Sequence, residues 1–146
     1  MTRITRDSFD PGEALNAFSG GRAATGAIAS FVGLARGTRS TGPVLELEAY
    51  PGFTEREIEG FVLEAIQRFG LQDAEVIHRI GPIAAGEAIV LVMTAAPHRR
   101  AAFEACDYLM DYLKSRAPLW KREFGPDGSR WVEPTEGDLA DLERWA

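Results

Sequence analysis

The chain has 146 residues, 45% of them hydrophobic, which fits a single domain with a packed core. A net charge of −6 argues against general nucleic-acid binding, and a lone cysteine excludes an internal disulfide or a cysteine-rich metal centre. The longest apolar run, residues 88–96, is too short to span a bilayer, and the first ten residues do not resemble a secretion signal. We therefore expect a cytoplasmic protein that contacts neither nucleic acid nor membrane.

The first third of the chain predicts two strands around a helix. Residues 3–5 fit a short strand, and Asp10 followed by Pro11 is typical of a helix start. The glycines at 20 and 21 end that helix. Residues 24–32 are small and apolar, as in a buried strand.

A polar, glycine-rich loop over residues 33–43 is expected next, followed by a strand over 44–50. Apolar and acidic side chains alternate strictly along this strand, so Glu46 and Glu48 share one face. The two carboxylates could carry out acid–base chemistry, but a solvated sheet face is the preferred interpretation.

The middle of the chain predicts a long helix and two strands. Thr54 and Glu57 have the spacing of a capping box, and Gly70 ends the helix. Strands are expected around residues 76–80 and 88–94, with a turn over 81–86. The apolar positions of the helix recur at helical spacing and form a core-facing stripe: Ile58, Phe61, Val62, Ala65, Ile66 and Phe69.

The last third predicts a helix over about residues 98–116, which Pro118 ends, and then a hairpin with its turn at 125–128. The element order gives an α+β (mixed α/β) single domain with an antiparallel or mixed sheet and about three helices. We divide the chain into a domain over residues 1–133 and an acidic tail over 134–146, which is expected to be a loosely docked helix.

Charge is unevenly distributed, because residues 98–131 hold seven basic and five acidic side chains in an otherwise acidic chain. The only two lysines, Lys114 and Lys121, both lie there. A compositional bias toward arginine explains this pattern, and spacing alone favours that explanation. The alternative is a chemical need for an amine, since an ammonium can lose its proton when desolvated and a guanidinium cannot.

His98, Arg99 and Arg100 lie where a strand gives way to a helix, and free backbone N–H groups at a helix start attract anions. A phosphate cradle is therefore preferred over a solvated first turn. The helix is about 25–30 Å long, so His98 and Lys114 cannot share a small site in one chain. Either two sites exist, or a second protomer completes one; we predict a homodimer.

Three further groups favour structural roles. Cys106 lies on the apolar stripe of the last helix and is a core residue rather than a nucleophile, and His78 lies within a strand. The aromatic side chains of the hairpin could stack on a flat heterocycle, but a hairpin core is preferred; they are Trp120, Phe124 and Trp131.

At these residues the chain resembles the large, catalytic subunits of molybdopterin synthase, the MoaE family. The resemblance covers most of the chain, and the run MDYLKSRAPLWKRE within its fourth segment is specific to that family. The matching segments are GAIASFVGLAR (26–36), LELEAYPGFTE (45–55), VIHRIG (76–81), AAPHRRAAFEACDYLMDYLKSRAPLWKRE (95–123) and GSRWVE (128–133).

The resemblance implies an α/β-hammerhead fold and a sulfurtransferase of molybdenum cofactor biosynthesis. The substrate would be cyclic pyranopterin monophosphate. Two sulfurs would come from a small, ubiquitin-like MoaD-type subunit with a C-terminal Gly-Gly thiocarboxylate. A central homodimer with one small subunit at each end is implied, and no cofactor or metal.

The family motifs also imply site residues, and they reverse the preference on the lysines. Lys114 and Lys121 become the catalytic candidates, and the substrate-binding candidates are Arg36, His98, Arg99, Arg122 and Glu123.

Two positions depart from the family pattern. Many members carry a basic residue where this chain has Leu34, and another where it has Pro134 and Thr135. These losses of positive charge motivate an alternative, a non-catalytic anion-binding or scaffold module of the same fold. A nucleic-acid-binding function through the basic segment is a weaker alternative.

Overall fold

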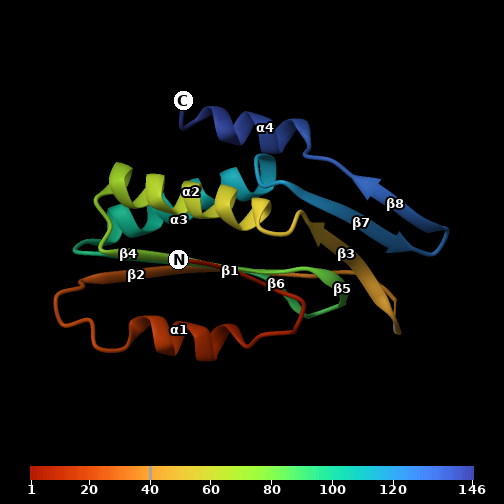
Figure 1. The fold of residues 1–146 in the computed structure, drawn as a ribbon, viewed down its shortest axis with the longest axis horizontal. Helices are drawn as coiled ribbons and strands as arrows, with labels where there is room; N and C mark the ends of the chain where they lie inside the picture. Colours follow the sequence, from red (N-terminus) through yellow and green to blue (C-terminus); the bar gives the residue numbers. More distant parts are fainter. Residues whose placement is uncertain (40) are drawn as a thin grey trace.

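The structure, a computed structural model, describes residues 1–39 and 41–146; residue 40 of the predicted glycine-rich loop lies outside the described residues. Two four-stranded sheets and four helices form these parts of the chain (Figure 1). In chain order the elements are β1 (Thr2–Thr5), α1 (Pro11–Ser19), β2 (Ala27–Leu34), β3 (Pro43–Ala49), α2 (Phe53–Phe69), β4 (Asp73–Arg79), β5 (Gly81–Ala84), β6 (Ala88–Ala96), α3 (Arg99–Ser115), β7 (Leu119–Gly125), β8 (Gly128–Val132) and α4 (Glu136–Glu143).

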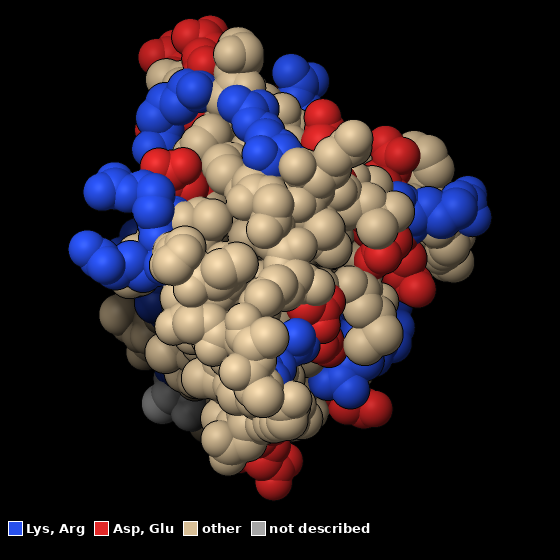
Figure 2. Space-filling view, turned by 90° about the vertical axis from the view of Figure 1, so that its left-hand side faces the viewer, with Lys and Arg blue, Asp and Glu red and all other residues tan. Residues whose placement is uncertain are grey.

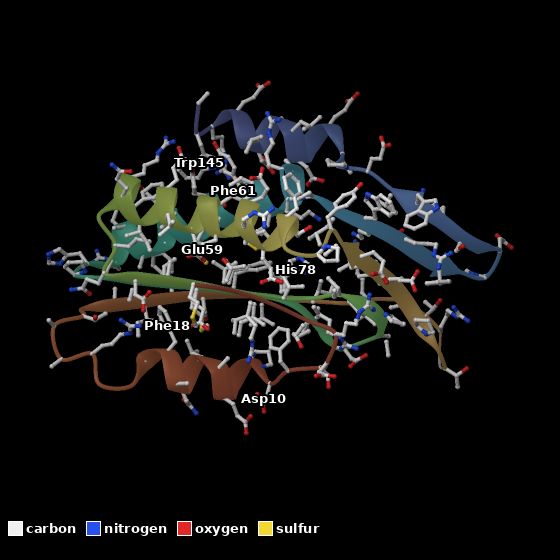
Figure 3. All side chains as sticks on the ribbon, in the orientation of Figure 1. Asp10, Phe18, Glu59, Phe61, His78 and Trp145 are labelled. Carbon is white, nitrogen blue, oxygen red and sulfur yellow. The ribbon has the colours of Figure 1, made fainter. Side chains whose placement is uncertain are left out.

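Sheet A has the strand order β1-β4-β6-β2 and helices on both faces (Figure 1). Only β1 and β4 are parallel. Helix α1 packs Phe18 against one face, onto Ile77, Leu91 and Met93 (Figure 3). Helices α2 and α3 cover the other face with the predicted apolar stripes, of which Ile58 and Leu109 are fully buried. The main core therefore lies on either side of this sheet.

Sheet B has the strand order β5-β3-β7-β8 and is antiparallel throughout. It has a smaller core, centred on Leu45, Leu47 and Ile83. Strand β5 corrects the expectation of a simple turn over residues 81–86. Gly81 has φ +82, and the backbone pairs Leu47 with Gly81 before the turn is made at Gly86.

The predicted capping box of α2 is wrong. The N-cap is Gly52, whose φ of +78 suits glycine, and Thr54 is fully buried inside the first turn. The Thr54 hydroxyl accepts from the backbone N–H of Tyr50 at 2.9 Å and donates to the carbonyl of Pro118 at 2.9 Å. The polar side chain that looked like a cap therefore ties the start of α2 to the entry of β7.

The fold class is the predicted one, with three helices before the tail and a fourth in the tail. The acidic tail forms α4, which packs along α3. Over residues 1–39 and 41–146, no helix is both long and apolar enough to cross a membrane.

Candidate functional site

The two lysines meet where α3 ends and β7 begins. Lys114 is in the last turn of α3 and is exposed, and Lys121 is the third residue of β7, with its side chain 34% exposed. Pro118 prevents α3 from continuing into the segment between them. The Thr54 hydroxyl fixes the position of this segment by donating a hydrogen bond to the Pro118 carbonyl. The turn at Pro118 thus brings two lysines that are seven positions apart in the sequence close enough for their charges to interact.

The surroundings of Lys121 act on its charge. Partial burial lowers the pKa of the Lys121 ammonium, and the neighbouring charge of Lys114 lowers this pKa further. Glu123, whose carboxylate lies 3.8 Å from Lys121 Nζ, and Asp138 raise it again. Such a lysine releases its proton more easily than a solvated one, which suits an amine that moves protons or attacks a carbonyl.

Alternation along β7 separates the candidate residues onto two faces. Lys121 and Glu123 are paired with Leu47 and Leu45 of β3, so they lie on the face of sheet B that carries its core. Arg122 is paired with Glu46 and lies on the opposite face, where its guanidinium bonds the Glu46 carboxylate. The structure therefore brings Glu123 to the lysine pair and turns Arg122 away from it.

The outer face of sheet B carries an aromatic cluster, which corrects the prediction of a hairpin core. Trp120 is 53% and Trp131 59% exposed, and their ring centroids lie 6.3 Å apart. Tyr50 adds a T-shaped contact to Trp120 at 5.2 Å. This face has no helix against it in Figure 1, so the rings stay on the surface.

The acidic pair Glu46 and Glu48 is on the same outer face, as the alternation predicts. Each carboxylate is bonded to an arginine, Glu46 to Arg122 and Glu48 to Arg6, the latter at 2.7 Å. These partners favour the structural interpretation over acid–base chemistry.

His98 and Arg99 lie at the other end of α3, at the opposite end of the molecule from β7 (Figure 1). His98 is the N-cap residue, and both side chains are exposed. A Cβ on Gly26 would lie 2.0 Å from the carbonyl oxygen of Pro97, so the chain before His98 is packed directly on the backbone at the start of β2. Figure 2 faces this end and shows an uncharged centre with basic and acidic side chains around it.

Arg36 lies beyond the end of β2, where Ala35 exchanges backbone hydrogen bonds with Gly86 and Glu87. Because Ala27 pairs with Ala96 and Leu34 with Ala88, Arg36 and His98 are at opposite ends of the β2–β6 ladder. That ladder spans about 25 Å. Within one chain His98 and Arg99 therefore lie apart from Arg36 and from the lysine pair.

One charged residue near the lysines was missed by sequence analysis. Asp138 lies in the first turn of α4, and its carbonyl accepts a hydrogen bond from the hydroxyl of Ser115, next to Lys114, at 3.0 Å. The signal was present in Thr135 and Asp138, which form a capping box and thus fix where the tail helix starts.

Cys106 and His78 have the structural roles predicted for them. Burial raises the pKa of the Cys106 thiol to about 12, which leaves it without thiolate character at neutral pH. His78 is buried, with its Nδ1 2.9 Å from the carbonyl oxygen of Arg79.

Comparisons with known proteins identify the family of the chain. A family model described as MoaE protein matches residues 4–116. A molybdopterin synthase catalytic subunit of Caulobacter vibrioides is 58% identical over 145 residues, covering 99% of this chain and 97% of that protein. A MoaE protein from Burkholderia ambifaria has a TM-score of 0.83 at 41% identity, covering 100% of this chain and 98% of that one. A complex of subunits 1 and 2 of molybdopterin-converting factor from Helicobacter pylori shares the fold, with a TM-score of 0.74 at 21% identity over 92% of this chain and 90% of that one. The chain belongs to the MoaE family.

Proposed function

We propose that this chain is the catalytic subunit of a molybdopterin synthase, which transfers two sulfurs to cyclic pyranopterin monophosphate and so forms a dithiolene. The observation that carries the proposal is the pair Lys114 and Lys121 at the α3–β7 junction, in a chain 58% identical to a protein of that name. The sulfur arrives on the partner subunit, so the buried Cys106 need not react.

The two lysines differ in a way that suggests separate roles. Lys114 is exposed and presents an ammonium to anionic groups such as a thiocarboxylate or a phosphate. Lys121 is half-buried and has a lowered pKa, which suits it to protonate a leaving oxygen or to form a transient covalent bond. Glu123 stays within 3.8 Å of Lys121 and orients it.

Reconstitution tests this function. The chain is mixed with a thiocarboxylated small subunit from the same source and with cyclic pyranopterin monophosphate, and the dithiolene pterin is measured. Lys114→Ala and Lys121→Ala should lose product formation while keeping their melting temperatures. Full activity in either alanine variant would refute the role of that lysine.

Arginine at the same positions separates charge from proton transfer, because a guanidinium keeps the charge and cannot release a proton. We expect Lys114→Arg to keep part of the activity and Lys121→Arg to lose it.

The proposed partners are a small MoaD-type sulfur carrier and a second copy of this chain. The relative's name, a catalytic subunit, and the two-subunit complex from Helicobacter pylori support the first. The second is supported by β2, the edge strand of sheet A, on which Phe31, Val32 and Leu34 are 43%, 39% and 58% exposed. Long apolar edge strands readily pair with another chain.

Antiparallel pairing of two β2 strands would also unite the separated groups of residues. The start of one β2 would lie against the end of the other, so His98 and Arg99 of one protomer would approach Arg36 of its partner. His98→Ala should then lose product formation as Lys121→Ala does, and mixing the two variants should restore activity in mixed dimers. No recovery, or a 16 kDa species alone in sedimentation, would contradict a shared site.

The cytoplasm is the proposed compartment. A free, buried Cys106 and a reactive thiocarboxylate partner both suit a reducing environment. Fractionation of cells that express the chain from its own gene would test this.

A further inference from the structure

The C-terminal helix α4 is fastened to the body of the molecule at both ends. At its far end, Arg144 bonds Asp107 and Asp111 of α3, and Trp145 Nε1 donates to Asp111 Oδ2 at 2.6 Å. The Trp145 ring packs edge-on against Phe69, with the ring centroids 5.8 Å apart. The Asp111 side chain is only 12% exposed, so its bonds to Arg144 and Trp145 are partly shielded from water on the Asp111 side, whereas the Arg144–Asp107 pair is an exposed surface pair.

The near end of α4 lies on the last turn of α3. Ser115 Oγ donates to the Asp138 carbonyl at 3.0 Å, and the capping box with Thr135 fixes the Asp138 carboxylate in the first turn. Figure 1 shows the start of α4 above the α3–β7 junction, which is where the lysines meet.

We propose that α4 is a working part of the lysine site, in which Asp138 acts as a positioning residue that places a carboxylate beside the Lys114–Lys121 pair. The catalytic meaning of this placement rests on the proposed function; the placement itself does not. The tail over 134–146 then belongs to the functional unit of the chain, and the boundary at residue 133 separates no independent part.

The charge balance around Lys121 explains why such a carboxylate is useful. Three charged groups act on Lys121, and each comes from a different element: Lys114 from α3, Glu123 from β7 and Asp138 from α4. Two ammonium groups repel each other and favour loss of a proton. Asp138 opposes that loss, so it keeps Lys121 protonated over a wider pH range and ready to act as an acid.

The composition of the chain makes the test direct. Reductive methylation with ¹³C-formaldehyde labels only Lys114, Lys121 and the amino terminus. Lys114→Arg and Lys121→Arg assign the two lysine signals, and the pKa of each is then read from its chemical shift against pH. The measurement needs neither partner nor substrate.

Asp138→Asn should lower the midpoint of the Lys121 titration by roughly 0.3–0.5 pH unit. The asparagine oxygen can still accept from the Thr135 N–H, so the helix start is preserved. The matched control is Asp141→Asn, an equal change of charge one turn further along α4, which should leave the Lys121 titration in place. Equal midpoints in wild type and Asp138→Asn would overturn the proposal.

A substitution that weakens the attachment of the far end of α4, while leaving the Trp145–Asp111 bond, provides a second variant. Arg144→Gln removes the bonds to Asp107 and Asp111, so it should shift Lys121 in the same direction. Combined with Asp138→Asn it should add nothing, because both changes remove the same carboxylate from the lysines. Additive shifts would contradict this.

The same variants separate the two hypotheses. If reconstitution gives product, its pH profile should move in Asp138→Asn and not in Asp141→Asn. If the titration shifts as expected while no product forms, the placement of Asp138 stands and the proposed reaction fails.

Discussion

Strands β6 and β7 illustrate how differently the two sheets are used. In β6, at the centre of sheet A, eight of nine residues are buried between α1 on one side and α2 with α3 on the other. In β7, at the centre of sheet B, all seven residues remain at least partly exposed. Sheet A supplies most of the apolar burial that stabilises the fold, and sheet B, which is covered less, presents charged and aromatic side chains.

The difference matters for the lysine site. A fully buried lysine would be neutral and unreachable, and a fully solvated one would behave as an ordinary surface ammonium. The thin cover on sheet B leaves Lys121 between these limits. The comparison predicts that changes in sheet B alter chemistry, and that changes in sheet A alter stability.

The largest expected effect is on chemistry. Lys121→Ala should lower product formation by about 100-fold or more, the usual contribution of an acid–base group, with little change in melting temperature. Single-turnover product formation and thermal denaturation measure the two effects. Arg3→Ala, which removes an exposed cation from β1 of sheet A, is the control and should keep activity. A parallel fall in melting temperature and activity for Lys121→Ala would contradict the expectation that changes in sheet B alter chemistry and not stability.

The largest effect on stability is expected in the main core, between sheet A and helices α2 and α3. Leu109 is fully buried in the main core, so Leu109→Ala should cost about 2–5 kcal/mol of unfolding free energy. Activity per folded molecule should stay near wild type. Urea denaturation measures the loss, and Leu63→Ala, at a position of α2 that is 58% exposed, should change stability by about 0.5 kcal/mol or less.

The pH dependence of stability sharpens the same contrast. Burial lowers the pKa of His78 in β4 below its ordinary value of 6.5. Below pH 6.5, His78 therefore binds a proton in the unfolded chain but not in the native state. The free energy of unfolding should then fall with decreasing pH by up to about 1.4 kcal/mol per pH unit. The fall should level off once the pH drops below the native pKa.

Urea titrations between pH 5 and pH 7.5 test this expectation. His78→Gln should flatten the slope, whereas His98→Gln, at an exposed position, should leave it intact. A slope that persists in His78→Gln would assign the effect to other groups.

The smallest effect is expected on the outer face of sheet B. Trp131 is 59% exposed and stacks on the Arg122 guanidinium with 5.2 Å between the ring centroid and Cζ. Exposed contacts of this kind contribute about 0.5–1 kcal/mol, so Trp131→Ala should destabilise the chain by no more than that. A loss as large as that of Leu109→Ala would show that this face carries the fold.

The spacing of apolar residues and the residues that start or end helices predicted most elements of the fold. The helix starting after Asp10, the stripe ending at Gly70 and the break at Pro118 all have strong local signals. Strand β5 was missed because four residues between two glycines read as a turn, and only pairing with β3 makes them a strand.

The site was less accessible to sequence analysis because its geometry is set by contacts between distant residues. Nothing local shows that Trp120 and Trp131 remain uncovered, since their exposure depends on where the helices pack. Arg122 follows Lys121 directly and yet faces the other way, a consequence of the pleat that the motif alone does not convey. The role of Asp138 needed the docking of α4, which depends on Arg144 and Trp145.

The contact between Gly26 and Pro97 limits which substitutions this chain can accept during evolution. Even a methyl group at position 26 would collide with a backbone oxygen, and backbone moves less readily than a side chain. Any replacement must push the segment that leads to His98 outward. It would therefore displace His98, a candidate anion-binding residue, without contacting it directly. Among viable descendants of this sequence, we expect position 26 to be fixed as glycine while its neighbours Thr25 and Ala27 drift.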